Sequence, residues 1–435
     1  MSAGLGDALR DALAGSPLAE RLPLAAEPLV LRRGGDAAAR RLDGRLLVGV
    51  ARVVATRPEV AGFLSHRPAL FARIAEAGPG TLAARARDLA SEDAAAPDAD
   101  LEGALDAMRV LRREETCLAA ALELGGVVCF EELSWFLSLL AETIARRALG
   151  LAQRGRGAEL SVIGLGKIAG REFTYHSDLD LVFLHDGGAE ALAEAARVGQ
   201  RLISYLTTMT GAGIAYAVDT RLRPSGRQGA LVTSLEGFER YQTTQAETWE
   251  HLALLRSRAI AGRVADGQAA LDRVRRRILE AAVDPWPYLA SLRRRVHAER
   301  GRESTQAAAI KTGLGGLMDL DFLAEGGVLE RRPPVFPELP GIPALLRAAH
   351  DGPGAGALLE DYAFLRLVES RARWLAGRAV EAVELAPPVG PLVAELVAPG
   401  LRAEELGVRL TAARARVAAA FEAVLAAGTL AALAR

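Results

Sequence analysis

The chain has 435 residues, of which 50% are hydrophobic and 25% are charged, and its formal net charge at pH 7 is −1. This length suffices for two or three domains with sizeable cores, and the near-neutral charge argues against a nucleic-acid-binding protein. The first residues lack the pattern of a secretory signal, and no run of about 18 apolar residues predicts a membrane span, so we expect a cytoplasmic protein.

The first third of the chain has the pattern of amphipathic helices. Residues 103–125 and 131–151 carry apolar side chains at three- and four-residue spacing, which predicts two helices. Before them, the small and polar residues 91–100 are typical of an exposed linker. We therefore expect residues 1–155 to form an N-terminal helical domain.

Residues 156–265 differ from this pattern. The predicted strands are 160–164, 179–184 and 213–219, with a short edge strand at Leu231 and Val232 and a helix at about 190–209. Thr233, followed three residues later by Glu236, predicts a capping box that opens another helix. The expected central domain, residues 156–265, is thus a small unit with a mixed sheet.

Helical patterns return from residue 266 and continue to residue 435, which predicts a C-terminal helical bundle. Residues 331–356 are rich in proline and glycine and are predicted to form a loop. An apolar stripe predicts a buried helix over 356–377. The three arginines at 293–295 fall within a helix and are expected on a solvated face. The fold class expected for the whole chain is α+β.

The most informative stretch is Asp178-Leu179-Asp180, at the start of the second predicted strand. Side chains alternate along a strand, so the two carboxylates point to the same side. At close range they repel by roughly 4 kcal/mol at an effective dielectric of about 20. A cation between them relieves this repulsion, and hard carboxylate oxygens suit Mg²⁺. Asp219, at the end of another predicted strand, is a third carboxylate able to join them if the strands are neighbours.

Lysine is rare in this arginine-rich chain. Lys167 and Lys311 are the only lysines in the sequence, and there is no asparagine. A lysine retained against such a bias indicates a need for a compact charge that arginine does not replace. Lys167 lies in a glycine-rich turn, and Lys311 lies just before another glycine-rich segment.

The turn from Gly164 to Gly170 follows the first predicted strand. It fits neither the dinucleotide-binding fingerprint, since its third glycine comes one residue late, nor the Walker pattern, since Ile168 replaces the hydroxyl residue. A glycine turn about ten residues before an Asp-x-Asp pair resembles the polymerase-beta-like nucleotidyltransferase fold. In that fold, backbone amides of the turn approach the triphosphate.

The resemblance becomes more specific when separate segments are taken together. Those that resemble glutamine synthetase adenylyltransferases are, in chain order, 63–68, 164–186, 219–226, 231–234, 248–251, 256–258 and 315–322. Their order is that of the family. This resemblance implies a central polymerase-beta-like domain between N- and C-terminal helical bundles, and a single catalytic half where the family usually has two.

The resemblance also implies a function. It is the transfer of AMP from ATP to a tyrosine of glutamine synthetase, which regulates nitrogen assimilation. Two alternatives stay open: phosphorolytic removal of AMP from the modified enzyme, and a non-catalytic helical regulator that binds glutamine synthetase or a PII-type signal protein. Retention of all three aspartates argues against the non-catalytic alternative.

The resemblance assigns roles to eight residues. Asp178, Asp180 and Asp219 would be the catalytic and Mg²⁺-binding carboxylates. The residues implied to bind the nucleotide are Gly166, Lys167, Ser177, Arg221 and Arg223. For the two arginines, ion pairing with the aspartates is an equally acceptable interpretation. Asp321 stands where the family usually has glutamate, which leaves the role of the 319–321 element open.

Overall fold

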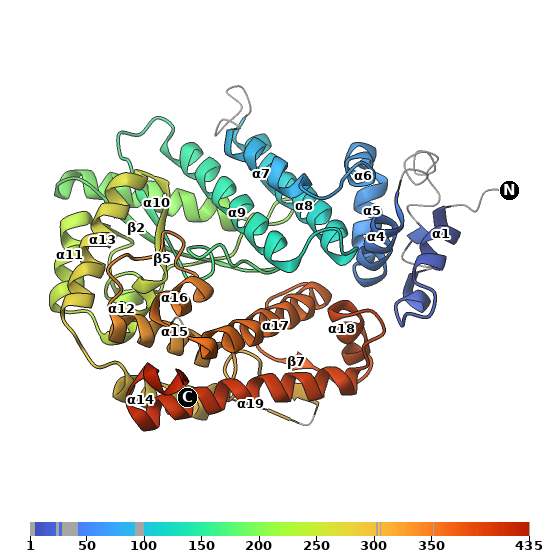
Figure 1. The fold of residues 1–435 in the computed structure, drawn as a ribbon. Helices are drawn as coiled ribbons and strands as arrows, with labels where there is room; N and C mark the ends of the chain where they lie inside the picture. The colour runs from blue at the N-terminus through green and yellow to red at the C-terminus, as the bar shows by residue number, and fades with distance from the viewer. Residues whose placement is uncertain are drawn as a thin grey trace.

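The structure is a computed structural model, and it describes residues 5–22, 26–27, 42–91, 100–301, 303–304, 306–350 and 352–434. The protein is α+β, as predicted, with a mixed sheet among many helices (Figure 1). Apart from its two end residues, the predicted linker at 91–100 lies outside the described residues. No helix in the described ranges combines the length and the apolarity that a membrane span requires.

Helices form the N-terminal part of the described chain. They are α1 (Leu5–Ala12), α4 (Gly44–Thr56), α5 (Pro58–Ser65), α6 (Pro68–Ala75), α7 (Thr81–Ser91), α8 (Leu101–Leu124) and α9 (Phe130–Gln153). The last two confirm the helices predicted at 103–125 and 131–151. Helix α8 begins where the Asp100 carboxylate accepts a hydrogen bond from the Gly103 amide at 2.6 Å, which satisfies an otherwise unpaired N–H group.

The sheet has five strands. They are β1 (Ser161–Leu165), β2 (Leu179–His185), β3 (Val218–Asp219), β4 (Val232–Ser234) and β5 (Ser257–Gly262). The order is β3-β2-β1-β5, and β4 also pairs directly with β2, at residues 183–185, farther along that strand than β3. Strand β1 is antiparallel to β2 and β5, whereas β3 and β4 run parallel to β2, so the sheet is mixed as predicted.

The prediction of a strand over residues 213–219 is mostly wrong, because only the last two of these residues pair with the sheet. The amides of Ala215 and Tyr216 both donate to the Leu206 carbonyl of α10 at 3.0 Å, which ties this segment to the preceding helix. Strand β5 was not predicted at all. Its alternating arginine and small residues in 256–262 do not make the apolar alternation by which strands are recognised.

Two hydrophobic cores meet at the sheet. Val162, Leu181 and Phe183 belong to a core shared with α8, α9 and α10, whereas Val182 and Leu184 belong to one shared with the C-terminal helices. This alternation follows from the period of two along a strand. Because Asp180 shares its face with Val182 and Leu184, it points toward the C-terminal helices.

Of the remaining helices, α10 packs in the first core and α11 to α19 contribute to the second. They are α10 (Ala189–Thr207), α11 (Leu235–Thr244), α12 (Thr248–Leu255), α13 (Val264–Glu280), α14 (Trp286–Arg300), α15 (Leu317–Arg331), α16 (Ile342–Ala349), α17 (Pro353–Ala376), α18 (Val389–Val397) and α19 (Ala403–Ala427). Strands β6 (Ala307–Ala308) and β7 (Val383–Glu384) form a separate pair. Helix α17 confirms the predicted helix at 356–377 and runs between the N-terminal helices and α19 (Figure 1).

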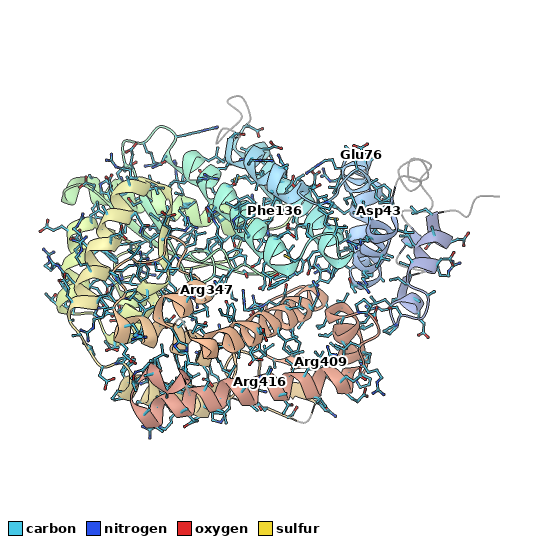
Figure 2. All side chains as sticks on the ribbon, viewed as in Figure 1. Asp43, Glu76, Phe136, Arg347, Arg409 and Arg416 are labelled. Atoms are coloured by element: carbon cyan, nitrogen blue, oxygen red, sulfur yellow. The ribbon has the colours of Figure 1, made fainter. Side chains whose placement is uncertain are left out.

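Three local predictions are corrected. Residues 331–356 contain α16, because Pro343 lies in the first turn of that helix, where a missing N–H group costs nothing. Helix α11 is capped by Ser234, whose hydroxyl accepts from the Gly237 amide at 3.0 Å, while Thr233 belongs to β4. Arg293 is buried and not on a solvated face. Figure 2 shows the contrast between an interior residue, Phe136, and a surface residue, Arg409.

Candidate active site

The pairing of β2 with β3 brings the predicted carboxylates together. In the parallel register, Asp180 is the partner of Asp219, so the two side chains project from the same face of the sheet. The two strands that carry them lie about 4.8 Å apart. Asp178 comes one residue before β2 and keeps the alternation. All three line one cavity of about 440 Å³.

The glycine turn lies directly against these carboxylates. Gly166 follows β1 with φ of +61°, a left-handed conformation that side chains disfavour, and its amide donates to the Arg256 carbonyl at 2.7 Å. A β-carbon at this position would be 3.6 Å from Oδ2 of Asp180. The turn therefore places backbone without a side chain beside the carboxylate of Asp180, and it places Lys167 at the cavity wall.

Lys167 reaches a buried anion on α17. Its Nζ lies 3.5 Å from Oε1 of Glu369, and Arg366 and Arg373 bind the same carboxylate from either side. Burial lowers the pKa of Lys167 to about 8, against the opposing effect of Glu369. Burial alone would raise the pKa of Glu369, but Lys167 and the two arginines outweigh it, so its pKa is well below the ordinary value.

A second ion-pair system closes the side of the cavity. Arg256 binds Oε2 of Glu172 at 3.2 Å and Oδ1 of Asp321 at 3.1 Å. Oε1 of Glu172 accepts a hydrogen bond from the Tyr362 hydroxyl at 2.7 Å. Asp321 thus faces the cavity, whereas Asp319 is buried and pairs with Arg293, so the two aspartates of α15 point apart.

The electrostatics of Asp180 show how tightly the acidic groups are packed. Burial, followed by the charges of Asp178 and Asp219, raises the pKa of Asp180 to about 6, although Lys167 and Lys311 act in the opposite direction. A carboxylate with a raised pKa in such company is stabilised by a proton or by a metal cation.

In the described ranges, no three His, Cys, Asp or Glu side chains are already arranged to hold a metal ion. The carboxylate of Asp219 is engaged by Arg221, whose backbone amide donates to Oδ1 at 2.8 Å and whose Nε donates to Oδ2 at 2.7 Å. The carboxylate oxygens still have the chemistry that Mg²⁺ prefers. Arg221 therefore competes with a metal ion for the carboxylate oxygens of Asp219.

Of the five predicted nucleotide-binding residues, three line the cavity: Gly166, Lys167 and Arg221. The other two do not. The buried Ser177 hydroxyl accepts from the Thr174 amide at 3.1 Å, and Arg223 donates to the carbonyls of Thr220 and Gly229. Arg221 and Arg223 do not continue the strand alternation of Asp219, because β3 ends at Asp219.

Sequence reasoning missed the contribution of α17. Four of its residues that line the cavity are spaced by four, three and four positions, so they share one helix face: Tyr362, Arg366, Glu369 and Arg373. That spacing is readable in the sequence as a charged stripe beside an apolar one. Lys311 and Arg300 also line the cavity. The scarcity of lysine had singled out Lys311 but had not assigned it a role.

The comparison with known families agrees with this arrangement. Residues 47–273, which include the sheet and all three carboxylates, match the family model for glutamate-ammonia ligase adenylyltransferase. The chain therefore belongs to this family, and the resemblance predicted from its motifs is confirmed.

Its curated relatives are much longer proteins. The chain is 40% identical over 65% of its length to the bifunctional glutamine synthetase adenylyltransferase/adenylyl-removing enzyme of Bordetella bronchiseptica, covering 32% of that protein. It is 33% identical over 72% of its length to the enzyme of the same name from Pseudomonas putida, covering 36% of it. The chain thus spans about a third of the length of the relatives it matches.

Proposed function

We propose that this chain is a nucleotidyltransferase of the polymerase-beta-like type that attaches AMP from ATP to a tyrosine of glutamine synthetase. The observation that carries the proposal is the pairing of Asp180 with Asp219 beside Gly166, since it gathers acidic groups next to open backbone. The relatives' names include this activity. The family resemblance supports a PII-type signal protein as a second partner.

Mg²⁺ fits the donor set, because three carboxylates from adjoining segments line one cavity and Asp180 has a raised pKa. Asp178, Asp180 and Asp219 would hold the ion. When bound, it would neutralise charge on the triphosphate and on the departing pyrophosphate. Asp219, once free of Arg221, can also take the proton of the tyrosine hydroxyl.

The cationic wall suits the phosphates of ATP. Lys167 and Lys311 line the cavity together with Arg300. Within the described residues, the Lys311 ammonium makes no hydrogen bond or ion pair, so it is available to a ligand. The side chain of Arg221 is 62% exposed, and on leaving Asp219 it can turn to a phosphate. Cations placed in this way stabilise the charge that develops during phosphoryl transfer.

The reverse reaction is the second candidate, because the relatives' names pair an adenylyltransferase with an adenylyl-removing activity. In that direction inorganic phosphate would attack the bond between AMP and tyrosine at the same carboxylates. Nothing in the geometry of the cavity favours one direction over the other.

One pair of assays separates the two directions. Unmodified glutamine synthetase is incubated with the protein, Mg²⁺ and ATP labelled in the adenine, and adenylylated enzyme is incubated with Mg²⁺ and phosphate. We expect label on the target in the first assay. Release of ADP in the second assay alone would reverse the proposed direction. If neither product forms and Asp178→Asn leaves every measured property intact, the protein is a non-catalytic regulator.

A further inference from the structure

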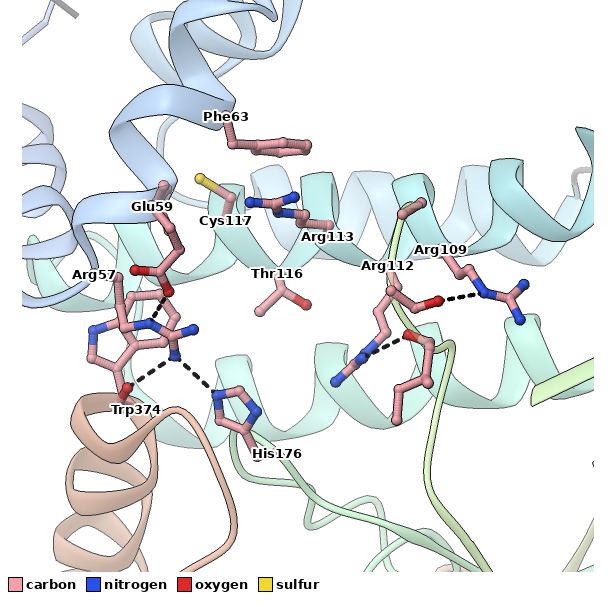
Figure 3. Close-up of a pocket in the computed structure, with 14 residues that line it drawn as sticks. Arg57, Glu59, Phe63, Arg109, Arg112, Arg113, Thr116, Cys117, His176 and Trp374 are labelled. Atoms are coloured by element: carbon pink, nitrogen blue, oxygen red, sulfur yellow. Dashed lines mark hydrogen bonds and ion pairs between the residues drawn. The ribbon is translucent and has the colours of Figure 1, made fainter. Parts of the chain in front are cut away.

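A second cavity, of about 280 Å³, is lined by His176 of the loop that leads to Asp178. It is walled by α5, α8, the loop at His176 and the end of α17 (Figure 3). Four arginines line it, but Glu59 is the only carboxylate among its lining residues. Such an excess of guanidinium groups in a concave site favours an anion.

Two of these arginines already have their hydrogen bonds taken up by the protein. Arg109 is buried and donates to four backbone carbonyls, those of Leu105, Tyr205, Thr208 and Gly213. Arg57 pairs with Glu59 and lies 3.2 Å from both Nε2 of His176 and the Trp374 carbonyl. These two residues hold the walls of the cavity together.

The other two arginines are oriented but not neutralised. The Arg113 guanidinium stacks on Phe63 at 4.1 Å from the ring centroid, and that of Arg112 stacks on Tyr216 at 4.6 Å. Arg112 donates a hydrogen bond to the Ile214 carbonyl at 3.2 Å and another to the Tyr216 hydroxyl. Neither has an ion pair within the described residues. Stacking fixes the plane of a guanidinium and leaves its N–H edge free for a bidentate oxyanion.

We propose that this cavity binds a small metabolite through a carboxylate or phosphate group held by Arg112 and Arg113. Thr116, on the next turn of α8, offers a hydroxyl for a further hydrogen bond, and Val60 and Cys117 form an apolar wall for the rest of the ligand. The volume is at the lower end of ligand pockets, so the ligand is small. This proposal does not depend on the proposed enzymatic activity.

The test is a thermal-unfolding titration with two probes, inorganic phosphate and glutarate, at constant ionic strength set with chloride. The variants are Arg113→Gln and Arg112→Gln/Arg113→Gln. Lys311→Gln is the control for anions that bind in the aspartate cavity, and Arg240→Gln, on the exposed face of α11, is the control for charge alone. For the wild type we expect a rise in midpoint of roughly 2 °C at ten times the dissociation constant of the better probe.

The expected result is that Lys311→Gln and Arg240→Gln keep this rise, while the Arg112/Arg113 double variant loses it and Arg113→Gln retains less than half. The better probe then identifies the ligand group as phosphate or carboxylate. Three results would overturn the proposal: no rise with either probe, a rise that only Lys311→Gln abolishes, or a rise unchanged in the double variant. Because Arg113 is exposed and makes no hydrogen bond within the described chain, its single variant is expected to fold.

Discussion

Asp180 lies on a partly buried strand face beside two further carboxylates. Its raised pKa reflects the free-energy cost of ionising the carboxyl group in that position. The cost comes first from burial and then from like charge. A bound cation offsets this free-energy cost, and carboxylates with raised pKa values therefore mark functional sites. The same residue therefore allows a test of both chemistry and stability.

Asp180→Asn should lower the rate of the proposed adenylylation by at least about a hundredfold, the upper end of the effects seen for groups that merely support a metal ligand. The reason is the loss of a charged oxygen that the proposed Mg²⁺ site would require. The measurement is incorporation of labelled AMP into glutamine synthetase. Asp186→Asn is the matched control, since Asp186 is exposed just beyond β2 and does not line the cavity. Equal rates for both variants would remove Asp180 from the mechanism.

Without metal or nucleotide, the same substitution should stabilise the fold at high pH. The pKa of Asp180 is raised to about 6 in the folded state, so its charged form costs stability above that pH, and the cost is absent below about 4, where the group is protonated in both states. We expect Asp180→Asn to be more stable by on the order of 2 kcal/mol at pH 8 and no more stable at pH 4. Urea unfolding in EDTA across this range measures the difference, and a gap that does not change with pH contradicts the assignment.

Glu369 gathers three cations in a buried position, and the removal of its charge should be costly. Glu369→Gln leaves Lys167, Arg366 and Arg373 without their shared anion, and we expect a loss of about 3–5 kcal/mol in the free energy of unfolding. Chemical denaturation at neutral pH provides the measurement. Glu384→Gln, at an exposed strand residue, is the control and should change stability by less than about 0.5 kcal/mol. A loss no larger than that of the control would mean that the cations are solvated.

At the scale of elements, the turn after β1 decides how close backbone comes to the acidic pair. Gly166→Ala should cost about 1–2 kcal/mol of stability, because alanine is strained at φ of +61°. It should also weaken ATP binding, because the added methyl group lies beside Oδ2 of Asp180, where the nucleotide is expected. Gly155→Ala is the matched control: its φ is +70° and no atom lies within 4 Å of the added carbon. Calorimetric titration with ATP should show weaker binding for the first variant only.

Short elements also explain where the sequence was misleading. A short apolar run predicted β1 and alternation predicted β2, but alternation also extended β3 back to 213, because it carries no information on hydrogen-bond partners. Similarly, the proline and glycine content of 331–356 led to the prediction of a loop where the structure has α16. Proline is compatible with that helix because it lies in the first turn.

At the scale of the whole molecule, the sheet depends on helices from both ends of the chain. One face packs on α8, α9 and α10, and the other on helices that follow residue 264. Contacts also cross directly from end to end: Arg371 of α17 forms a buried ion pair with Glu123 of α8. The predicted domain boundaries at 155/156 and 265/266 stay a prediction, and this packing suggests a test of them.

A fragment of residues 156–265 should not fold alone, because its sheet would lose α8 and α9 from one face and α13 from the other, and only α10, α11 and α12 would remain. Circular dichroism of the isolated fragment is expected to show no cooperative thermal transition, whereas the full chain shows one. A fragment of residues 100–280, which restores α8, α9 and α13, should recover part of the transition. Cooperative unfolding of the short fragment would instead establish 156–265 as an independent domain.

The sequence by itself determined the family, the α+β class and the three aspartates with their glycine turn, because these depend on local patterns and on strand alternation. Only the tertiary structure placed Glu369, Lys311 and Arg300 in the same cavity, and only it turned Ser177 and Arg223 away. The placements of Glu369 and Lys311 depend on how α17 and the loop before α15 pack on the sheet. Contacts between residues some two hundred positions apart leave no mark in a local pattern.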